Sequence, residues 1–432
     1  MTLRRHAVST TIAVALLIVG LVIGAVGMYG LAAAGVLTVS STSSSSGLSG
    51  TITIGNLVAL TGDLASQGAR DKAAVDLAIS DINTWLNSTG AKYKFAVDTD
   101  DTATDDNTAL ADIQALNAKG VTVYVGPEWS GGTTEILNYA DTNHLVLLSE
   151  SATAVTLAIP NDYLFRLIPD DAAQGQALAA LQNQMGIQAV AVIHRNDPYG
   201  NGLSSAFESD FQAVGGKTLV DLPYDTTATD YSTQLATAQS DVSQAVSQYG
   251  ASHVAVELIS FDEGGVIMQQ ASTSYSSLLN VKWFGCDGEA QLDPFVTTAA
   301  SEALKVDLYS TLYSPGGSTL YDAFVQKFEA VSGISIQSYA AAAYDCTWIA
   351  ALSIIAAGST NGQKIQEEIL NIAAHYYGPS GYPNLDAAGD KTIANYDVWG
   401  VQALPNGTAT WNLIGTWNYQ TNVVNFVNGT TP

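Results

Sequence analysis

The segment Val121–Leu137, VTVYVGPEWSGGTTEIL, begins with a β-branched and aromatic run, Val121–Val125, that stops at Gly126-Pro127. Trp129, Ser130 and two glycines follow before a helical pattern resumes. A strand that passes through a Gly-rich turn into a helix leaves free backbone N–H groups at the turn, and such groups bind anions. The segment therefore predicts a strand–helix unit with an anion site at its turn.

Strand–helix alternation extends in both directions from this segment. A helix expected over Ala69–Leu86 places its apolar residues on one face. Such alternation predicts parallel sheets with helices on both faces, and two series of strands predict an α/β protein of two lobes. The expected strands are Thr51–Ala59, Tyr93–Val97, Val121–Val125 and Leu145–Leu148, then Ala189–Ile193, Lys217–Leu222, His253–Leu258 and Lys282–Gly285.

The first 50 residues differ from the rest. Arg4 and Arg5 precede an uncharged stretch of 27 residues, Thr11–Leu37, and about 20 apolar residues span a bilayer. We therefore expect residues 1–39 to form a transmembrane anchor that leaves the remaining chain outside the cell, and residues 40–50 to form a Ser-rich flexible linker. A cleaved secretory signal is the alternative, although its apolar core is usually only about 7–15 residues long.

The chain after residue 50 is acidic but sparsely charged. Without Arg4 and Arg5 it carries 13 basic and 40 acidic residues, an imbalance that repels polyanions, so we expect no nucleic-acid partner. Charged residues make up only 13% of the whole chain, which predicts a stability that varies weakly with pH. The acceptor pattern for N-glycosylation occurs at Asn87, Asn406 and Asn428.

Motifs of catalytic and metal sites are missing from the sequence. It contains no His-Glu-x-x-His zinc motif and no Gly-x-Ser-x-Gly nucleophile motif. The acidic run Asp98–Asp106 lacks the glycine and glutamate of a calcium loop, and we expect it to end a strand and cap the next helix. We therefore expect no enzyme activity, no metal and no cofactor. Cys286 and Cys346 are expected to be two separate buried thiols.

Four segments resemble, in their order along the chain, solute-binding proteins of ABC transporters for branched-chain amino acids. They are IGNLVALTGDLASQG, FRLIPDDAAQGQALA, AVIHRNDPYGNGLSSAFESDF and QSYAAAAYDCTWIAALSIIAA. The resemblance covers Thr51 to about Trp417. It implies the type I periplasmic-binding-protein fold, in which two Rossmann-like lobes joined by three crossings close over a ligand. The implied division is residues 51–170 for lobe 1, 171–310 for lobe 2, 311–395 for the return to lobe 1 and 396–432 for the return to lobe 2.

The resemblance also implies ligand-binding positions in the first lobe. Ser130 matches the serine that binds the α-carboxylate of the ligand. Ser151 and Thr153 match a pair that supplies a backbone carbonyl to the ammonium and a hydroxyl to the carboxylate. Gln67 falls at a position near the mouth of the site. Glu128 and Glu150 depart from the family pattern, and we expect both to point away because a buried carboxylate without a partner is costly.

Three positions in the second lobe complete the implied site. Tyr199 matches a tyrosine that covers the ligand, and Phe261 matches an aromatic wall residue. Asp287 matches the acidic residue that pairs with the α-ammonium, although relatives often carry the longer glutamate there. The two ends of a zwitterion would then be bound by different lobes, which couples binding to closure.

The resemblance implies a receptor at the cell surface that captures an amino acid and delivers it to an ABC permease. Two alternatives stay open. The head of the chain, RRHAVSTTIAVALLIVG, resembles the pilin-like signals of some archaeal surface binding proteins, which would make the chain a self-assembling filament or layer subunit. His6 departs from that pattern, since it separates Arg5 from Ala7. The second alternative is the ectodomain of a sensor.

Overall fold

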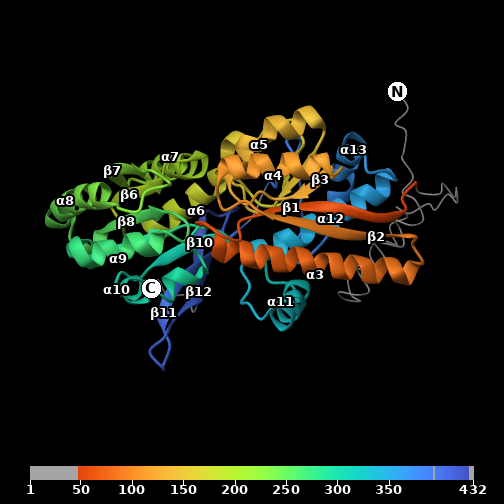
Figure 1. Ribbon diagram of the computed structural model, residues 1–432. Coiled ribbons are helices and arrows are strands. Elements are labelled where there is room, and N and C mark those ends of the chain that lie inside the picture. Colours follow the sequence, from red (N-terminus) through yellow and green to blue (C-terminus); the bar gives the residue numbers. More distant parts are fainter. Residues whose placement is uncertain (1–46, 393–394, 428–432) are drawn as a thin grey trace.

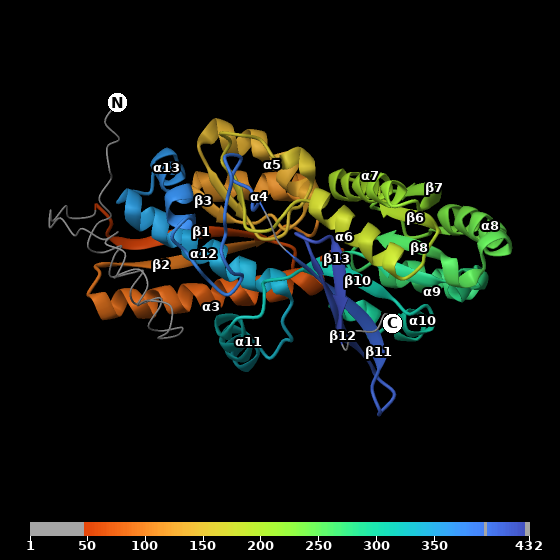
Figure 2. The same cartoon turned by 180° about the vertical axis from the view of Figure 1, so that it is seen from behind.

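Two α/β lobes lie end to end in the molecule (Figure 1). The structure is a computed structural model, and it describes residues 47–392 and 395–427. The predicted anchor at residues 1–39, most of the predicted linker and the acceptor Asn428 lie outside these ranges. The strands of each lobe form one sheet, and helices cover both faces of each sheet (Figures 1 and 2).

The first lobe is built on a five-stranded parallel sheet of order β2-β1-β3-β4-β5. Helices α3 and α12 pack together on one face, and α4 and α5 pack together on the other. The elements are β1 (Gly50–Val58), α3 (Ala65–Thr89), β2 (Tyr93–Asp101), α4 (Asp106–Ala118), β3 (Val123–Val125), α5 (Ser130–Asn143), β4 (Val146–Ser149), η1 (Val155–Leu157), β5 (Leu164–Arg166), α11 (Thr319–Ser332), α12 (Ser338–Ala357) and α13 (Gly362–Ala373).

The second lobe is built on an eight-stranded sheet of order β13-β12-β11-β10-β9-β8-β6-β7. Helices α6 and α7 pack on one face, and α8 packs on the other (Figure 2). The elements are α6 (Asp171–Gln184), β6 (Ala189–Arg195), α7 (Pro198–Ala213), β7 (Lys217–Tyr224), α8 (Ser232–Tyr249), η2 (Ala251–His253), β8 (Val254–Ile259), α9 (Gly264–Ser274), η3 (Ser276–Asn280), β9 (Lys282–Gly285), η4 (Asp293–Phe295), α10 (Ala300–Lys305), β10 (Tyr309–Tyr313), β11 (Tyr396–Ala403), β12 (Ala409–Asn418) and β13 (Val423–Phe426).

The expectation of parallel sheets is correct for the first lobe and for part of the second. Strands β7, β6, β8, β9 and β10 are parallel neighbours, whereas β11, β12 and β13 continue the sheet with antiparallel pairing. The physical reason is that β11 and β12 are joined by a short turn around Asn406-Gly407 instead of by a crossover helix.

Three connections join the lobes. The chain leaves the first lobe between β5 and α6, returns to it between β10 and α11, and leaves it again between α13 and β11. The predicted boundary between lobe 2 and the return to lobe 1, at residues 310 and 311, falls inside strand β10. All five residues of this strand pair within the sheet of the second lobe.

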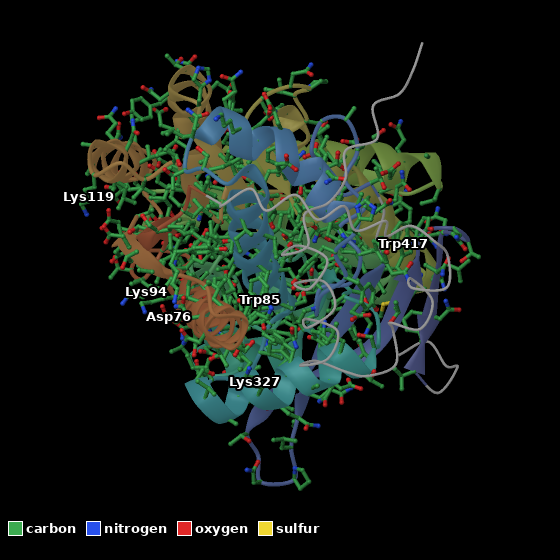
Figure 3. The ribbon with its side chains drawn as sticks, turned by 90° about the vertical axis from the view of Figure 1, so that its right-hand side faces the viewer. Asp76, Trp85, Lys94, Lys119, Lys327 and Trp417 are labelled. Atoms are coloured by element: carbon green, nitrogen blue, oxygen red, sulfur yellow. The ribbon has the colours of Figure 1, made fainter. Side chains whose placement is uncertain are left out.

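Helix α12 forms the core of the first lobe. Among the described residues it is the one helix that is long and apolar enough to cross a membrane, but 89% of its most apolar window is buried within the protein. It packs against α3, where the rings of Trp348 and Trp85 lie 6.1 Å apart. Figure 3 shows Trp85 on the side of α3 that faces the interior of this lobe. The helix is therefore a buried core element of the lobe.

Charged side chains on the outer end of the first lobe contribute little to its stability. In Figure 3, Lys119 and Lys327 lie on the outside of this end. Lys119 pairs with Asp98 at 2.7 Å, and Lys327 pairs with Asp81 at 2.6 Å. Exposed pairs of this kind contribute at most about 1 kcal/mol each, so the buried apolar core carries the stability of the lobe.

Two smaller predictions are confirmed. The acidic run ends strand β2 at Asp101, and the Asp105 side chain caps α4 by accepting a hydrogen bond from the backbone N–H of Thr108 at 2.7 Å. Cys286 and Cys346 are both free and buried. The acceptors Asn87 and Asn406 are exposed, at the end of α3 and in the β11–β12 turn.

We expect Gly126→Ala to destabilise the protein more than Gly120→Ala. Both glycines have φ +90°, a conformation that costs a residue with a side chain about 1–2 kcal/mol. A Cβ at Gly126 would also lie 2.2 Å from the carbonyl oxygen of Leu57, whereas a Cβ at Gly120 meets nothing within 4 Å. The clash should add at least about 1 kcal/mol. Urea unfolding of both variants measures the difference, and equal losses would contradict the close approach of Leu57.

Candidate ligand-binding site

Six of the seven predicted ligand residues line one cavity between the lobes. The gaps between its lining atoms add up to about 250 Å³, and about one water molecule fits there while the lobes are in contact. Leu64, Glu128, Trp129, Gly288 and Tyr339 complete its wall. The predicted residues that it brings together are Gln67, Ser130 and Ser151 from the first lobe, and Tyr199, Phe261 and Asp287 from the second. This small enclosed space, with polar groups from both sides, has the form of a site for a small solute.

Ser130 is the first residue of α5, and it lies where the β3–α5 turn meets the cavity. The residue that precedes the helix is Trp129, and no side chain caps this end of the helix. The first N–H groups of α5 therefore have no partner within the helix, and they carry the positive end of its dipole. The Ser130 hydroxyl accepts a hydrogen bond from the backbone N–H of Ala154 at 3.0 Å, which leaves its own proton for an anion.

The β4–β5 loop supplies the second polar group of the first lobe. The Ser151 hydroxyl donates to the carbonyl oxygen of Glu128 at 2.8 Å and accepts from the Gln67 amide at 2.8 Å. Gln67 is therefore buried within the cavity wall and does not project from an open mouth. Thr153 is also buried, but it does not line the cavity. It lies at the start of α6, where its carbonyl oxygen accepts a hydrogen bond from the backbone N–H of Asp171 at 2.9 Å.

A buried ion pair fixes the β4–β5 loop. The guanidinium of Arg166 donates to the carbonyl oxygens of Ala152 and Ala154 at 3.1 and 2.9 Å. The same group makes two hydrogen bonds to the carboxylate of Asp390, at 2.6 and 2.7 Å. Asp390 lies in the third connection between the lobes. The pair therefore ties the loop that carries Ser151 to the connecting segment.

The half of the site in the second lobe is centred on Asp287. One of its carboxylate oxygens accepts a hydrogen bond from the Tyr199 hydroxyl at 2.7 Å, and the other accepts one from the Tyr339 hydroxyl at 2.6 Å. The Tyr199 ring stacks on Phe261, with ring centres 5.2 Å apart. Burial raises the pKa of Asp287 above its usual value, although the two tyrosine hydroxyls act in the opposite direction.

Glu289 holds the loop that presents Asp287. Its carboxylate accepts hydrogen bonds from the Ser260 hydroxyl at 2.6 Å and from the backbone N–H of Cys286 at 2.7 Å. Burial raises the pKa of Glu289 to about 8. A Cβ at Gly288 would lie 2.1 Å from the carbonyl oxygen of Ser260, so this loop packs too closely for a larger residue at that position.

Tyr339 lines the cavity but was not among the residues predicted from the sequence. It lies in the first turn of α12, in the first lobe, so its hydrogen bond to Asp287 crosses between the lobes. The only signal in the sequence was a tyrosine at the start of an otherwise apolar helix, and that pattern is also typical of a core residue.

Further hydrogen bonds between the lobes surround the cavity. Arg70 of α3 pairs with Asp293 at 2.8 Å. The backbone N–H of Ser66 donates to the Asp262 carboxylate at 3.0 Å, and Arg195 pairs with Asp63 at 3.1 Å. The lobes are therefore in direct contact around the site, which encloses the cavity.

The expectation that Glu128 and Glu150 point away from the site is wrong for Glu128. Glu150 does not line the cavity, but it is buried beside Glu128. Glu128 lines the cavity, and both side chains are buried. With Asp71 they form a group whose oxygens lie within 4.8 Å of one another, and this is the one such group among the described residues that could coordinate a metal ion. Burial raises the pKa of all three carboxyls, that of Asp71 to about 7. Protonation therefore lowers the cost of burial that had argued against this placement.

Comparisons with known proteins show the family and the fold of the chain. The family described as "Receptor family ligand binding region" matches residues 70–403. An uncharacterized protein of Methanocaldococcus jannaschii is 29% identical over 393 residues, which is 87% of this chain and 91% of the relative. A leucine-, isoleucine-, valine-, threonine- and alanine-binding protein of Pseudomonas aeruginosa is 24% identical over 345 residues, which is 78% of this chain and 86% of the relative.

A solved leucine-binding protein of Thermotoga maritima has the same fold. It superposes with a TM-score of 0.70 at 20% identity, over 84% of this chain and 97% of that one. The chain thus has the two-lobed type I periplasmic-binding-protein fold. The chain belongs to the receptor ligand-binding-region family, and the resemblance inferred from the sequence is confirmed.

We expect Asp390→Ala to destabilise the protein by about 3–5 kcal/mol, because it leaves the buried Arg166 without its carboxylate. Asp98→Ala is the matched control, since it removes the carboxylate of an exposed pair and should cost at most about 1 kcal/mol. Urea unfolding measures both losses. A loss below about 1 kcal/mol for Asp390→Ala would contradict the role of this pair.

We also expect the melting temperature to rise as the pH falls from 8 to 5. Burial raises the pKa of Asp71 and of Asp345 to about 7 and that of Glu289 to about 8, whereas unfolded carboxyls titrate near about 4. Between these values the folded protein holds more protons than the unfolded chain, so acidification stabilises it. This expectation differs from the weak pH dependence of stability that the composition predicted. The effect of a carboxyl group on stability depends more on whether it is buried than on how many carboxyl groups the chain contains.

Differential scanning calorimetry across this pH range tests the expectation, with a rise of at least about 3 °C as the predicted result. Asp71→Asn removes one of the titrating groups and should reduce the slope. A melting temperature that is constant or falls between pH 8 and pH 5 would show that these carboxyls are ionised in the folded protein.

Proposed function

We propose that this protein is a cell-surface receptor that captures an amino acid between its two lobes and delivers it to an ABC permease. The observation that carries the proposal is the division of polar groups within one cavity. A free helix N-terminus and a hydroxyl, at Ser130, lie on one lobe, and a buried aspartate, Asp287, lies on the other. The two groups suit the opposite ends of a zwitterion.

The proposed binding mode follows from these positions. The α-carboxylate lies at the start of α5 and accepts hydrogen bonds from the Ser130 hydroxyl and from backbone N–H groups. The α-ammonium lies beside Asp287 and donates to it. Tyr199 and Phe261 form an aromatic wall on the side of the second lobe. Because neither lobe holds both charged ends, binding favours the arrangement in which the lobes touch.

Transport and surface location are supported by the relatives and by the head of the sequence. The Pseudomonas aeruginosa relative is a binding protein for leucine, isoleucine, valine, threonine and alanine. The uncharged stretch Thr11–Leu37 is long enough to anchor the chain in a membrane. An anchored receptor would hold its ligand close to a permease in the same membrane, which raises the effective concentration of the complex there.

Asp287→Ala should weaken amino-acid binding at least tenfold, about 1.4 kcal/mol, because the α-ammonium loses a charged acceptor. Isothermal titration calorimetry with a panel of amino acids measures the change. Asp322→Ala, at an exposed position on α11, is the matched control and should bind like the parent protein. Equal affinities for Asp287→Ala and the parent protein would remove Asp287 from the site.

A further inference from the structure

We propose that the solute carries a second positive charge, so that this site takes an amino acid with a cationic side chain. The inference rests on the proposed function, since it names the class of solute for the same cavity. It is carried by Glu128, which lines the cavity and is 1% exposed. Its Oε1 atom accepts no hydrogen bond from an N–H or hydroxyl group of the described residues, and its partner there is the carboxyl of Asp71, with which it shares a proton.

The position of the Glu128 carboxylate is fixed from one side only. Its Oε2 atom accepts a hydrogen bond from the backbone N–H of Ala59 at 2.6 Å. A Cβ at Gly68 would lie 3.2 Å from Oε1, so the glycine permits the close approach of the carboxylate to α3. The amide of Gln67 donates to Ser151 and Asp71 instead of to Glu128. A polar solute in the cavity can therefore supply the missing donor.

The neighbours of Glu128 are two further buried carboxyls, and burial raises the pKa of all three, so the group holds protons when no cation is bound. Asp71 and Glu150 each place an oxygen within 4.8 Å of it, and each has one buried oxygen that accepts no hydrogen bond from an N–H or hydroxyl group of the described residues. Within the described part of the chain, no lysine or arginine forms an ion pair with any of the three. An alkylammonium has three donors and no acceptor, so one that displaces these protons leaves three carboxylates as its acceptors.

A second, independent observation concerns the crevice that borders the cavity. This crevice shares Trp129 with the cavity, and Arg195 is the one cation among its lining residues. Arg195 is already paired with acidic side chains, two of which line the crevice. Such a surface attracts cations, so the approach to the site favours the same charge as its interior. The acidic lining residues are Asp63, Asp105, Asp106 and Asp197.

An organic ammonium fits the arrangement better than a bare metal ion. Calcium takes about 6–8 oxygen ligands, and the group offers three carboxylates, of which Glu128 alone faces the cavity. The cavity adjoining Glu128 is the one that already holds Ser130 and Asp287. A solute bound by those residues, admitted when the lobes move apart, would place its side chain beside Glu128.

Isothermal titration calorimetry of the purified full chain tests the inference with lysine and with norleucine, which has a similar carbon chain but no side-chain ammonium. We expect lysine to bind at least tenfold more tightly than norleucine. Glu128→Gln should lower the affinity for lysine at least tenfold and leave that for norleucine within about threefold, a factor worth less than about 0.7 kcal/mol. Glu329→Gln, at an exposed position on α11, is the matched control and should change neither.

The outcomes separate this inference from the proposed function. Binding of norleucine or leucine as tight as that of lysine would overturn the inference and leave the proposed function in place. Failure of all twenty common amino acids to bind would overturn both. Calcium chloride alone that raises the melting temperature of the parent protein, but not of Glu128→Gln, would assign the acidic group to a metal and overturn the inference. The comparison of lysine with norleucine in the parent protein does not depend on the folding of any variant.

Discussion

The buried carboxylate of Asp287, shared between tyrosines of the two lobes, is the interaction on which the site depends. A carboxylate removed from water must find donors, and Asp287 finds one in Tyr199 of its own lobe and another in Tyr339 of the opposite lobe. Separation of the lobes would break the second bond and admit water to the aspartate. The contact between the lobes and the state of the site are therefore physically linked.

Each half of the site is held in place by a different buried polar group. Glu289 gathers backbone and hydroxyl donors around the loop that presents Asp287. In the first lobe, Arg166 binds two carbonyl oxygens of the Ser151 loop and the carboxylate of Asp390. Neither group lines the cavity. They act as supports that fix the distance across which a small solute must bind.

The regular elements and the loops at the strand ends could be predicted from the sequence because they follow from periodicity and from the geometry of parallel sheets. The burial of Glu128 could not be predicted, because a carboxyl is buried at low cost only when its pKa is raised. That increase depends on the neighbouring carboxyls, which the fold brings together from distant parts of the sequence. Tyr339 could not be predicted either, because its role exists only when α12 meets the loop of the other lobe. The antiparallel strands β11 to β13 lay beyond the helix-and-strand alternation on which the prediction of parallel pairing was based.

A crystal structure of the protein with a bound amino acid would locate both ends of the ligand. We expect a ligand enclosed between the lobes, with its carboxylate at the start of α5 beside Ser130 and its α-ammonium within hydrogen-bond distance of Asp287. A ligand bound to one lobe alone, or one whose ammonium lies away from Asp287, would contradict the claim that the two lobes divide the ends of a zwitterion between them.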